Sequence, residues 1–261
     1  MISFKGKKGL VLGIANQRSI AYAVAQTLNS LGAEMAFTYG PDTKGRFKQN
    51  VEELAQGMNV SQILQLDVRD DGQIETLFSD LNKAWTDGMD FLVHSVAFAD
   101  RSDLEIPFSQ TNRKGWETAF DVSAYSMVPL ARHACPMMEK RGGGSMVAMS
   151  FIGSVLAVPN YNVMGPAKAA LESSNRYLAR EFGPKNVRVN TLSAGAIKTL
   201  SSSGIKAFGE MLKVAGEHSA MGRVVTQEEV GRTAAFLLSD WASGITGQTI
   251  YVDSGFNIMA N

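Results

Sequence analysis

The chain has 261 residues, of which 45% are hydrophobic and 19% charged, a balance typical of a compact protein with a substantial core. Lys and Arg together number 25, as do Asp and Glu, so the charge balance argues against nucleic acid as a partner. The single cysteine, Cys135, excludes an intramolecular disulfide and a multi-cysteine metal site, and the three widely spaced histidines lead us to expect no metal.

Apolar runs alternate with amphipathic segments from one end of the chain to the other. The first run, 9–14, is continuously apolar, as expected of a strand covered on both faces. Gly32 marks the stop of the first helix, and Thr226 with Glu229 three residues later predicts a capping box for the last one. In chain order, the predicted strands are 9–14, 34–39, 61–68, 89–99, 145–150, 187–195 and 248–255, and the predicted helices are 19–33, 43–57, 71–86, 114–140, 162–182 and 226–239.

This rhythm predicts a single α/β domain over residues 1–261, with a doubly wound Rossmann-type fold and a seven-stranded parallel sheet flanked by helices. The rhythm is broken at 196–225, where a long insertion follows a strand. Such an insertion is either a lid over a ligand or a surface excursion, and we expect a lid.

The basic and apolar N-terminus superficially resembles a signal peptide. The apolar run stops after a few residues, and no stretch approaches the roughly 18 apolar residues of a membrane span. We therefore interpret the segment as a buried first strand, and we expect a cytoplasmic protein that does not associate with membranes.

The turn after the first strand has the position of a phosphate-binding site. In doubly wound sheets, ligands bind outside the carboxyl ends of the strands. Gly13 ends the strand, and Ser19 and Ile20 open a helix whose N-terminal N–H groups suit a pyrophosphate. The usual glycine-rich fingerprint is absent, so position alone carries this prediction. The Ser19 hydroxyl could either cap the helix or donate to a phosphate.

The next two strand ends predict the adenosine half of a dinucleotide site. An acid after the second strand favours NAD and an arginine favours NADP. Asp42 comes slightly late and Arg46 later still, and we favour NADH while keeping NADPH possible. Asp67 and Val68 end the third strand, where Asp67 could bond the adenine amino group and Val68 could pack on the ring. The alternative is that Asp67 only caps a turn.

Tyr161 and Lys168 are seven residues apart at the start of the helix after the fifth strand. On a helix this spacing places two side chains within about 20° of one face and about 10 Å apart along the axis. Tyrosine could meet a substrate carbonyl while lysine holds the nicotinamide ribose. Pro166 between them is tolerated if it lies in the first turn, where N–H groups have no helical partner. An ordinary amphipathic surface is the alternative.

Several motifs at consistent spacing resemble one family over essentially the whole chain. These motifs are SIAYAVAQTL, GAEMAFTY, LVHSVAFA, NYNVMGPAKAALE, SAGAIKTL and SGITGQTIYVDSGF. They resemble the NADH-dependent enoyl-acyl carrier protein reductases, a divergent branch of the short-chain dehydrogenase/reductase superfamily. Common members of the superfamily carry Tyr-x3-Lys and a serine about 13 residues before the tyrosine. Here the gap is six residues, and Ala148 stands at the serine position.

The resemblance implies reduction of an enoyl thioester carried on acyl carrier protein, by a homotetramer. It implies that Tyr161 hydrogen-bonds the thioester carbonyl and that Lys168 binds the ribose. The implied cofactor contacts are Gly13, Ser19, Ile20, Asp67, Val68, Val96, Lys168, Ile197 and Thr199, and the expected substrate contacts are Ala99, Phe151 and Tyr161. Apolar spacings of three and four within 200–221 separately suggest a helix that lies over an acyl chain, so Ile205 and Phe208 are further expected substrate contacts. The alternative for this segment is ordinary core packing.

Three positions depart from the family pattern. Gly40 stands where a polar side chain often helps to bind the adenosine ribose, which bears on the NADH assignment. Phe151 stands where a second tyrosine is usual, so it keeps an aromatic wall and lacks the hydroxyl. Ala196 replaces a common proline, which leaves the following loop less restricted. The alternatives are a short-chain dehydrogenase acting on a carbonyl or alcohol, and a sensor that binds NADH without chemistry.

Overall fold

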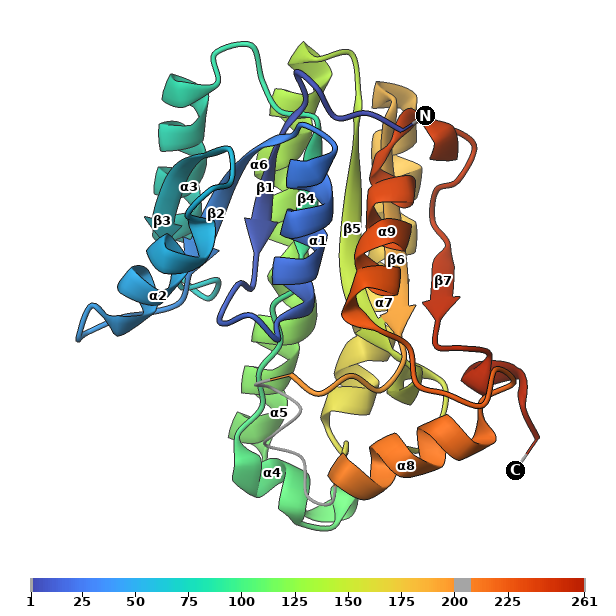
Figure 1. Ribbon diagram of the computed structural model, residues 1–261. Helices are drawn as coiled ribbons and strands as arrows, with labels where there is room; N and C mark the ends of the chain where they lie inside the picture. Colours follow the sequence, from blue (N-terminus) through green and yellow to red (C-terminus); the bar gives the residue numbers. More distant parts are fainter. Residues whose placement is uncertain (1, 200–207, 261) are drawn as a thin grey trace.

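The computed structural model describes residues 2–199 and 208–260 and forms one parallel sheet covered by helices on both faces (Figure 1). The strand order is β3-β2-β1-β4-β5-β6-β7, and every neighbouring pair is parallel. The strands are β1 (Lys8–Leu12), β2 (Glu34–Tyr39), β3 (Val60–Gln65), β4 (Phe91–His94), β5 (Gly144–Phe151), β6 (Val187–Ala194) and β7 (Thr249–Val252). The predicted fold class is confirmed.

The helices divide between the two faces of the sheet. In the described part of the chain, α1 packs against α9 on one face, and α3, α6 and α7 pack in series on the other. Their bounds are α1 (Ile20–Ser30), α2 (Arg46–Ala55), α3 (Asp71–Ala84), α4 (Arg101–Glu105), α5 (Arg113–Phe120), α6 (Met127–Lys140), α7 (Met164–Phe182), α8 (Phe208–His218) and α9 (Gln227–Leu238).

Alternation along each strand produces two hydrophobic cores. Leu10 and Leu12 of β1 belong to the core under α3, α6 and α7, whereas Val11 belongs to the core under α1 and α9. All three side chains are fully buried. Both faces of a parallel sheet are buried under helices, so its strands appear in the sequence as continuous apolar runs.

Two predicted elements differ from the structure, and one helix was not predicted. The predicted helix 114–140 is divided into α5 and α6 by a π-helical turn at Asp121–Tyr125. The predicted strand 89–99 is paired only over Phe91–His94, since the chain beyond leaves the sheet. The short helix α4 was not predicted, and α8 lies within the predicted insertion 196–225. Figure 1 shows α8 and α4 near the carboxyl ends of the strands.

No helix in the described ranges is both long and apolar enough to cross a bilayer.

The capping box predicted for α9 is present. Thr226 Oγ1 accepts from the Glu229 amide at 3.2 Å, and Glu229 Oε2 accepts from the Thr226 amide at 2.8 Å. Arg223 also bonds the Glu229 carboxylate, and these bonds hold the pKa of Glu229 at about 2. The carboxylate therefore stays ionised at neutral pH.

Replacing Thr226 with alanine should lower the free energy of unfolding by about 1 kcal/mol, because an N-terminal amide loses its side-chain acceptor. Thr233→Ala is the matched control, because the Thr233 hydroxyl donates a hydrogen bond to the Glu229 carbonyl within the same helix. The two variants would be compared by urea denaturation. Equal loss in both would show that the capping box contributes nothing measurable.

Candidate active site

A cavity of about 340 Å³ lies at the carboxyl ends of β1, β4, β5 and β6. The strand order changes direction at β1, whose neighbours are β2 and β4, so the cavity sits at the topological switch point of the sheet. Residues that follow β1 and β4 form one wall, and residues of β5, β6 and α7 form the other. This is the place where an open α/β sheet offers a crevice to a dinucleotide.

Most of the predicted site residues meet in this cavity. Its lining includes Gly13, Ser19, Ile20, Ala99, Phe151, Tyr161, Lys168, Ile197, Thr199 and Phe208. Asp67, Val68 and Val96 are not part of the lining. The predicted substrate contact Ile205 lies outside the described residues.

Gly13 allows the loop after β1 to pass very close to the end of β4. Its φ is +97°, and a Cβ atom placed there would lie 2.1 Å from the carbonyl oxygen of Ser95. Only glycine combines this backbone conformation with this proximity. The loop after β1 can therefore pass directly over the end of β4, and the crevice floor consists of backbone that a ligand can reach.

Ser19 occupies the N-cap position of α1, yet its hydroxyl does not cap the helix. The Ser19 Oγ atom instead accepts from the amides of Ala15 and Asn16, at 3.0 Å in both cases. The hydroxyl thus folds the preceding loop around itself and still has its own proton to donate. Of the two roles considered for Ser19, the structure contradicts the helix cap.

Asp67 has a local partner that the sequence analysis did not consider. Its carboxylate accepts from the guanidinium of Arg69 at 2.6 Å and from the Arg69 amide at 3.0 Å, and this pairing lowers the pKa of Asp67. These bonds favour the turn-capping alternative. Val68 is 8% exposed within the core under α3, so the adenine contacts of both residues stay predictions.

Tyr161 lies in a strained turn just before α7. Its neighbours Asn160 and Asn162 both have positive φ, at 60° and 41°. The ring meets Phe151 edge-on, with centroids 4.8 Å apart, and a Cβ on Gly153 would come within 2.5 Å of it. Burial raises the pKa of Tyr161, so the phenol keeps its proton at neutral pH and remains a hydrogen-bond donor.

Pro166 lies in the first turn of α7, as predicted. Tyr161 itself precedes the helix, so the helical spacing argument does not apply to it, although both side chains still line one cavity. Lys168 is only 5% exposed, and its Nζ donates to the Met149 carbonyl at 2.7 Å. Burial lowers the pKa of Lys168 to about 8, while Glu172 acts in the opposite direction.

Asn162 was missed by the sequence analysis. Its side-chain amide donates to the carbonyls of Asp103, Leu104 and Ile106, the last at 2.5 Å. These carbonyls end α4, so one side chain joins that helix to the turn of Tyr161. The sequence signal was an asparagine next to the tyrosine, a residue type that tolerates the left-handed conformation.

The π-helical turn anchors the loop after β4. Ser123 Oγ accepts from the Phe98 amide at 3.0 Å, and Ser126 Oγ lies 2.8 Å from Nε2 of His94. His94 is fully buried, and desolvation together with the positive charge of Lys168 lowers its pKa to about 3. The neutral ring therefore gives buried support to the next residue, Ser95, which lines the cavity. Widened turns of this kind often occur at functional sites.

A second cavity, of about 730 Å³, adjoins the first beneath α8. The two share Phe151, Gly195 and Ala196 in their linings. Phe208 of α8 lines the first cavity and Met211 lines the second. No residue of α8 is buried, so ordinary core packing, the alternative considered for this segment, does not describe the helix.

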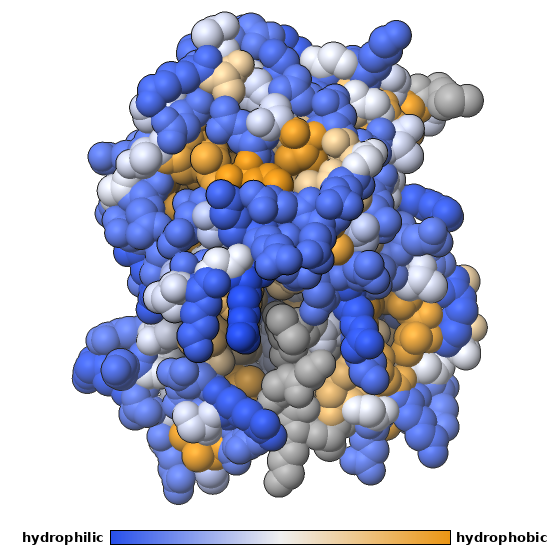
Figure 2. Space-filling model, turned by 60° about the vertical axis from the view of Figure 1, so that its left-hand side comes forward, coloured by the Kyte–Doolittle hydropathy of each residue, from blue (hydrophilic) through white to orange (hydrophobic). Residues whose placement is uncertain are grey.

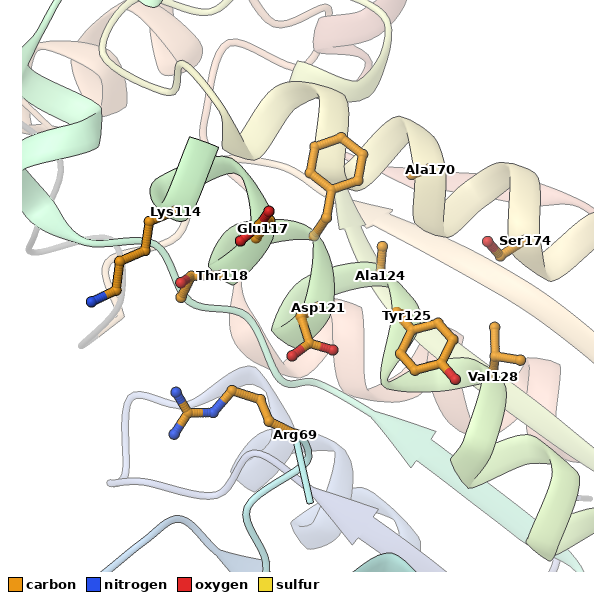
Figure 3. A pocket seen from close by; sticks show the side chains of 11 residues that line it. Arg69, Lys114, Glu117, Thr118, Asp121, Ala124, Tyr125, Val128, Ala170 and Ser174 are labelled. Atoms are coloured by element: carbon orange, nitrogen blue, oxygen red, sulfur yellow. The ribbon is translucent and has the colours of Figure 1, made fainter. Parts of the chain in front are cut away.

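A third hollow, of about 650 Å³, lies on the outer side of α5, α6 and α7 (Figure 3). Arg69 lies at one end of this hollow, with its guanidinium bonded to Asp67, while Tyr125 and Val128 line the opposite end. None of the predicted site residues lines it. We therefore take the cavity at the switch point as the candidate active site.

Among the residues the structure places, no group of three His, Cys, Asp or Glu side chains could hold a metal.

Fold and cleft together define a dinucleotide-dependent oxidoreductase of the short-chain dehydrogenase/reductase type, with a tyrosine and a buried lysine at the switch point. The chain belongs to the enoyl-(acyl carrier protein) reductase family, whose pattern matches residues 13–257. The predicted family and enzyme class are confirmed.

Individual relatives match from end to end. An NADH-dependent enoyl-[acyl-carrier-protein] reductase of Nostoc is 49% identical over 259 residues, which cover 99% of each chain. The Escherichia coli reductase is 44% identical over 98% of this chain and 95% of its own. The Bacillus cereus reductase, solved with NADP+ and an indole naphthyridinone, superimposes with a TM-score of 0.95 and 41% identity over the whole of both chains.

Replacing Gly13 with alanine should weaken NADH binding about tenfold or more. Forcing a non-glycine residue to this positive φ costs about 1–3 kcal/mol, and the new methyl displaces the Ser95 carbonyl. Binding would be measured by NADH fluorescence. Gly183→Ala is the control, because that position has negative φ and no atom within 4 Å of the added Cβ. Unchanged affinity in Gly13→Ala would remove the loop after β1 from the cofactor site.

Proposed function

We propose that this protein uses NADH to reduce the C2–C3 double bond of a trans-2-enoyl thioester carried on acyl carrier protein. We also propose that residues 1–261 form a single domain. The observation that carries the proposal is the meeting of Tyr161 and Lys168 in one cavity at the switch point. The relatives from Nostoc and Escherichia coli are named for this activity and share about half of their residues with this chain.

The cleft fits a dinucleotide on its own geometry. Gly13 opens the floor, α1 presents its N-terminus beside Ser19, and Lys168 offers a buried cation beyond them. When bound, the reduced nicotinamide supplies the hydride that goes to C3. Lys168 holds the ribose of the nicotinamide half and adds positive potential to the closed cleft.

Tyr161 acts on the thioester oxygen. Negative charge develops on this oxygen when hydride reaches C3, and a donor placed in advance stabilises that charge. Addition of a proton at C2 then completes the reduction and removes the charge. The phenol is suited to this role because burial keeps it protonated and Phe151 and Gly153 restrict its ring. Phe151 contributes an apolar wall to both cavities, which suits an acyl chain passing between them.

The cofactor preference is proposed to be NADH, with weaker use of NADPH. Relatives of both kinds exist, since the Staphylococcus aureus reductases are named for NADPH. The Asp42 carboxylate accepts from the amides of Lys44 and Lys48, at 3.1 and 2.9 Å, so it shapes its own loop. Steady-state assays with both nicotinamides would measure the preference directly.

Substrate choice separates this proposal from its rivals. Crotonyl and longer enoyl thioesters should support NADH oxidation, whereas acetoacetyl thioesters should not. A preference for acetoacetyl thioesters would instead identify a carbonyl reductase. Binding of NADH without turnover on any of these thioesters would favour the sensor.

Tyr161→Phe should lower kcat about 10²-fold, the effect of removing one donor to a developing oxyanion. The ring is kept, so its packing against Phe151 and the folded structure should persist. Tyr177→Phe on the exposed side of α7, where the side chain is 74% exposed, is the matched control. An unchanged kcat for Tyr161→Phe contradicts the role assigned to the phenol.

We also propose a cytoplasmic homotetramer. The hollow on α5, α6 and α7 is supporting evidence, because it exposes Tyr125 and small residues where a second copy could pack (Figure 3). Phe108 and Trp116 nearby are also exposed, with rings 6.4 Å apart. Figure 2 shows that hydrophobic residues elsewhere on one face gather in separate areas within a mostly hydrophilic surface.

Light scattering should give a particle of four chains of 28.1 kDa. Tyr125→Glu should reduce this mass, because it introduces a charge into the proposed interface. Phe47→Glu on α2, an equally exposed aromatic position, should leave the mass unchanged. A monomeric parent protein would refute the assembly.

A further inference from the structure

Helix α7 buries two opposite charges one turn apart. Lys168 is 5% exposed and Glu172, four residues later, is 7% exposed. Residues at this spacing lie on the same helix face, here the face turned to the sheet. Nothing in the proposed reaction uses Glu172, although an ionised carboxylate at such a depth is costly unless it has partners.

The two charged side chains form hydrogen bonds to successive residues of β5. Lys168 Nζ donates to the Met149 carbonyl at 2.7 Å, and Ser150 Oγ donates to Glu172 Oε1 at 2.5 Å. Ala148 belongs to the core beneath α7 and Met149 to the opposite core, so the Ser150 side chain points toward α7 by alternation. The carboxylate is therefore fixed in place by the same strand that fixes the ammonium.

A polar row continues from this pair across the sheet. Ser150 pairs with Ser193 of β6, and Ser193 pairs with Tyr251 of β7, so the three side chains lie on one face. Ser193 is 1% exposed, and its Oγ atom has no hydrogen-bond partner among the placed residues. Burial raises the pKa of Tyr251, and the negative charge of Glu172 adds to this effect.

We propose that Glu172, held by Ser150, is a positioning residue that keeps Lys168 cationic and aimed into the cofactor cleft. An isolated buried ammonium tends to lose its proton, and an opposite charge a few ångströms away counteracts that tendency. Ser150 supplies the hydrogen bond that an ionised carboxylate needs in the interior. The inference rests on the proposed role of Lys168 in cofactor binding.

The groups facing Lys168 come from every element packed around it. Glu172 raises its pKa, whereas burial lowers it to about 8. His94 on β4 is neutral because its pKa lies near 3, and Tyr161 is neutral because burial raises its pKa. At the end of β7, the pKa of Tyr251 is raised by burial and further by the negative charges of Glu172 and Asp253. Glu172 is therefore the charge whose removal should alter Lys168 most.

Glu172→Gln tests the proposal because glutamine keeps the shape and can still bond Ser150. The pKa of Lys168 would be followed by NMR of lysine 13Cε in the protein without cofactor, with the signal assigned from its absence in Lys168→Met. We expect this pKa to fall by about one unit or more in Glu172→Gln. Lys168 then loses its charge as the pH rises through a lower value than in the parent protein.

NADH binding should follow that titration. In Glu172→Gln the dissociation constant should rise several-fold at pH 8 and return toward the parent value as the pH falls to about 6, where Lys168 regains its proton. A purely structural defect would not recover on acidification. Glu181→Gln, an exposed glutamate of the same helix, is the matched control and should change neither readout.

Ser150→Ala provides an independent variant if Glu172→Gln does not fold. Without the bond to Ser150 the Glu172 carboxylate is no longer held in place, so the pKa of Lys168 should fall in the same direction by a smaller amount. An unchanged Lys168 pKa in either variant overturns the proposal. If Lys168→Met binds NADH normally, the cofactor role of Lys168 fails instead, and the NMR result still decides whether Glu172 controls its charge.

Discussion

The central constraint in this protein is the burial of one ammonium group against one backbone carbonyl. Lys168 Nζ reaches the Met149 carbonyl only if α7 crosses β5 at one position along the strand, because the hydrogen bond joins a side chain of the helix to the end of that strand. The same placement sets Tyr161 at the entrance of the helix and Phe151 opposite it. A cation in a closed cleft interacts with ligands far more strongly than it would in water, so a small error in this packing has a large electrostatic effect.

A second constraint acts where β1 and β4 separate. Gly13 passes so close to Ser95 that any side chain would collide with its carbonyl. Behind Ser95, the buried His94 ring and the hydroxyls of Ser123 and Ser126 tie the loop to the π-helical turn. The wall formed by the residues after β1 and β4 therefore depends both on the absence of a side chain at Gly13 and on the buried polar side chains behind Ser95.

Continuous apolar runs were enough to predict the strands, because both faces of the sheet are dry, and Thr226 with Glu229 was enough to predict a helix start. The π-helical turn was not predictable, since residues 114–140 have the composition of one ordinary helix and the bonds of Ser123 to Phe98 and of Ser126 to His94 join residues far apart in the sequence. The Asn162 contacts to α4 and the pairing of Asp67 with Arg69 were missed for the same reason: a sequence pattern indicates which residues are polar, and only the fold decides their partners.

The parts of the site differ in how firmly they are held, and this difference separates chemistry from substrate range. Lys168 belongs to a helix anchored in both the core and the sheet, and Tyr161 lies in the turn just before that helix, whereas α8 buries no residue and contributes Phe208 and Met211 to two adjoining cavities. Elements with few buried contacts are the ones that open at low free-energy cost. Ala196, which replaces a residue with a fixed φ, lies where both cavities meet and where the chain leaves β6 toward α8. Changes in α8 should therefore affect which acyl chains are accepted, while the contact that we propose between Tyr161 and the thioester oxygen depends on β5 and on the turn before α7.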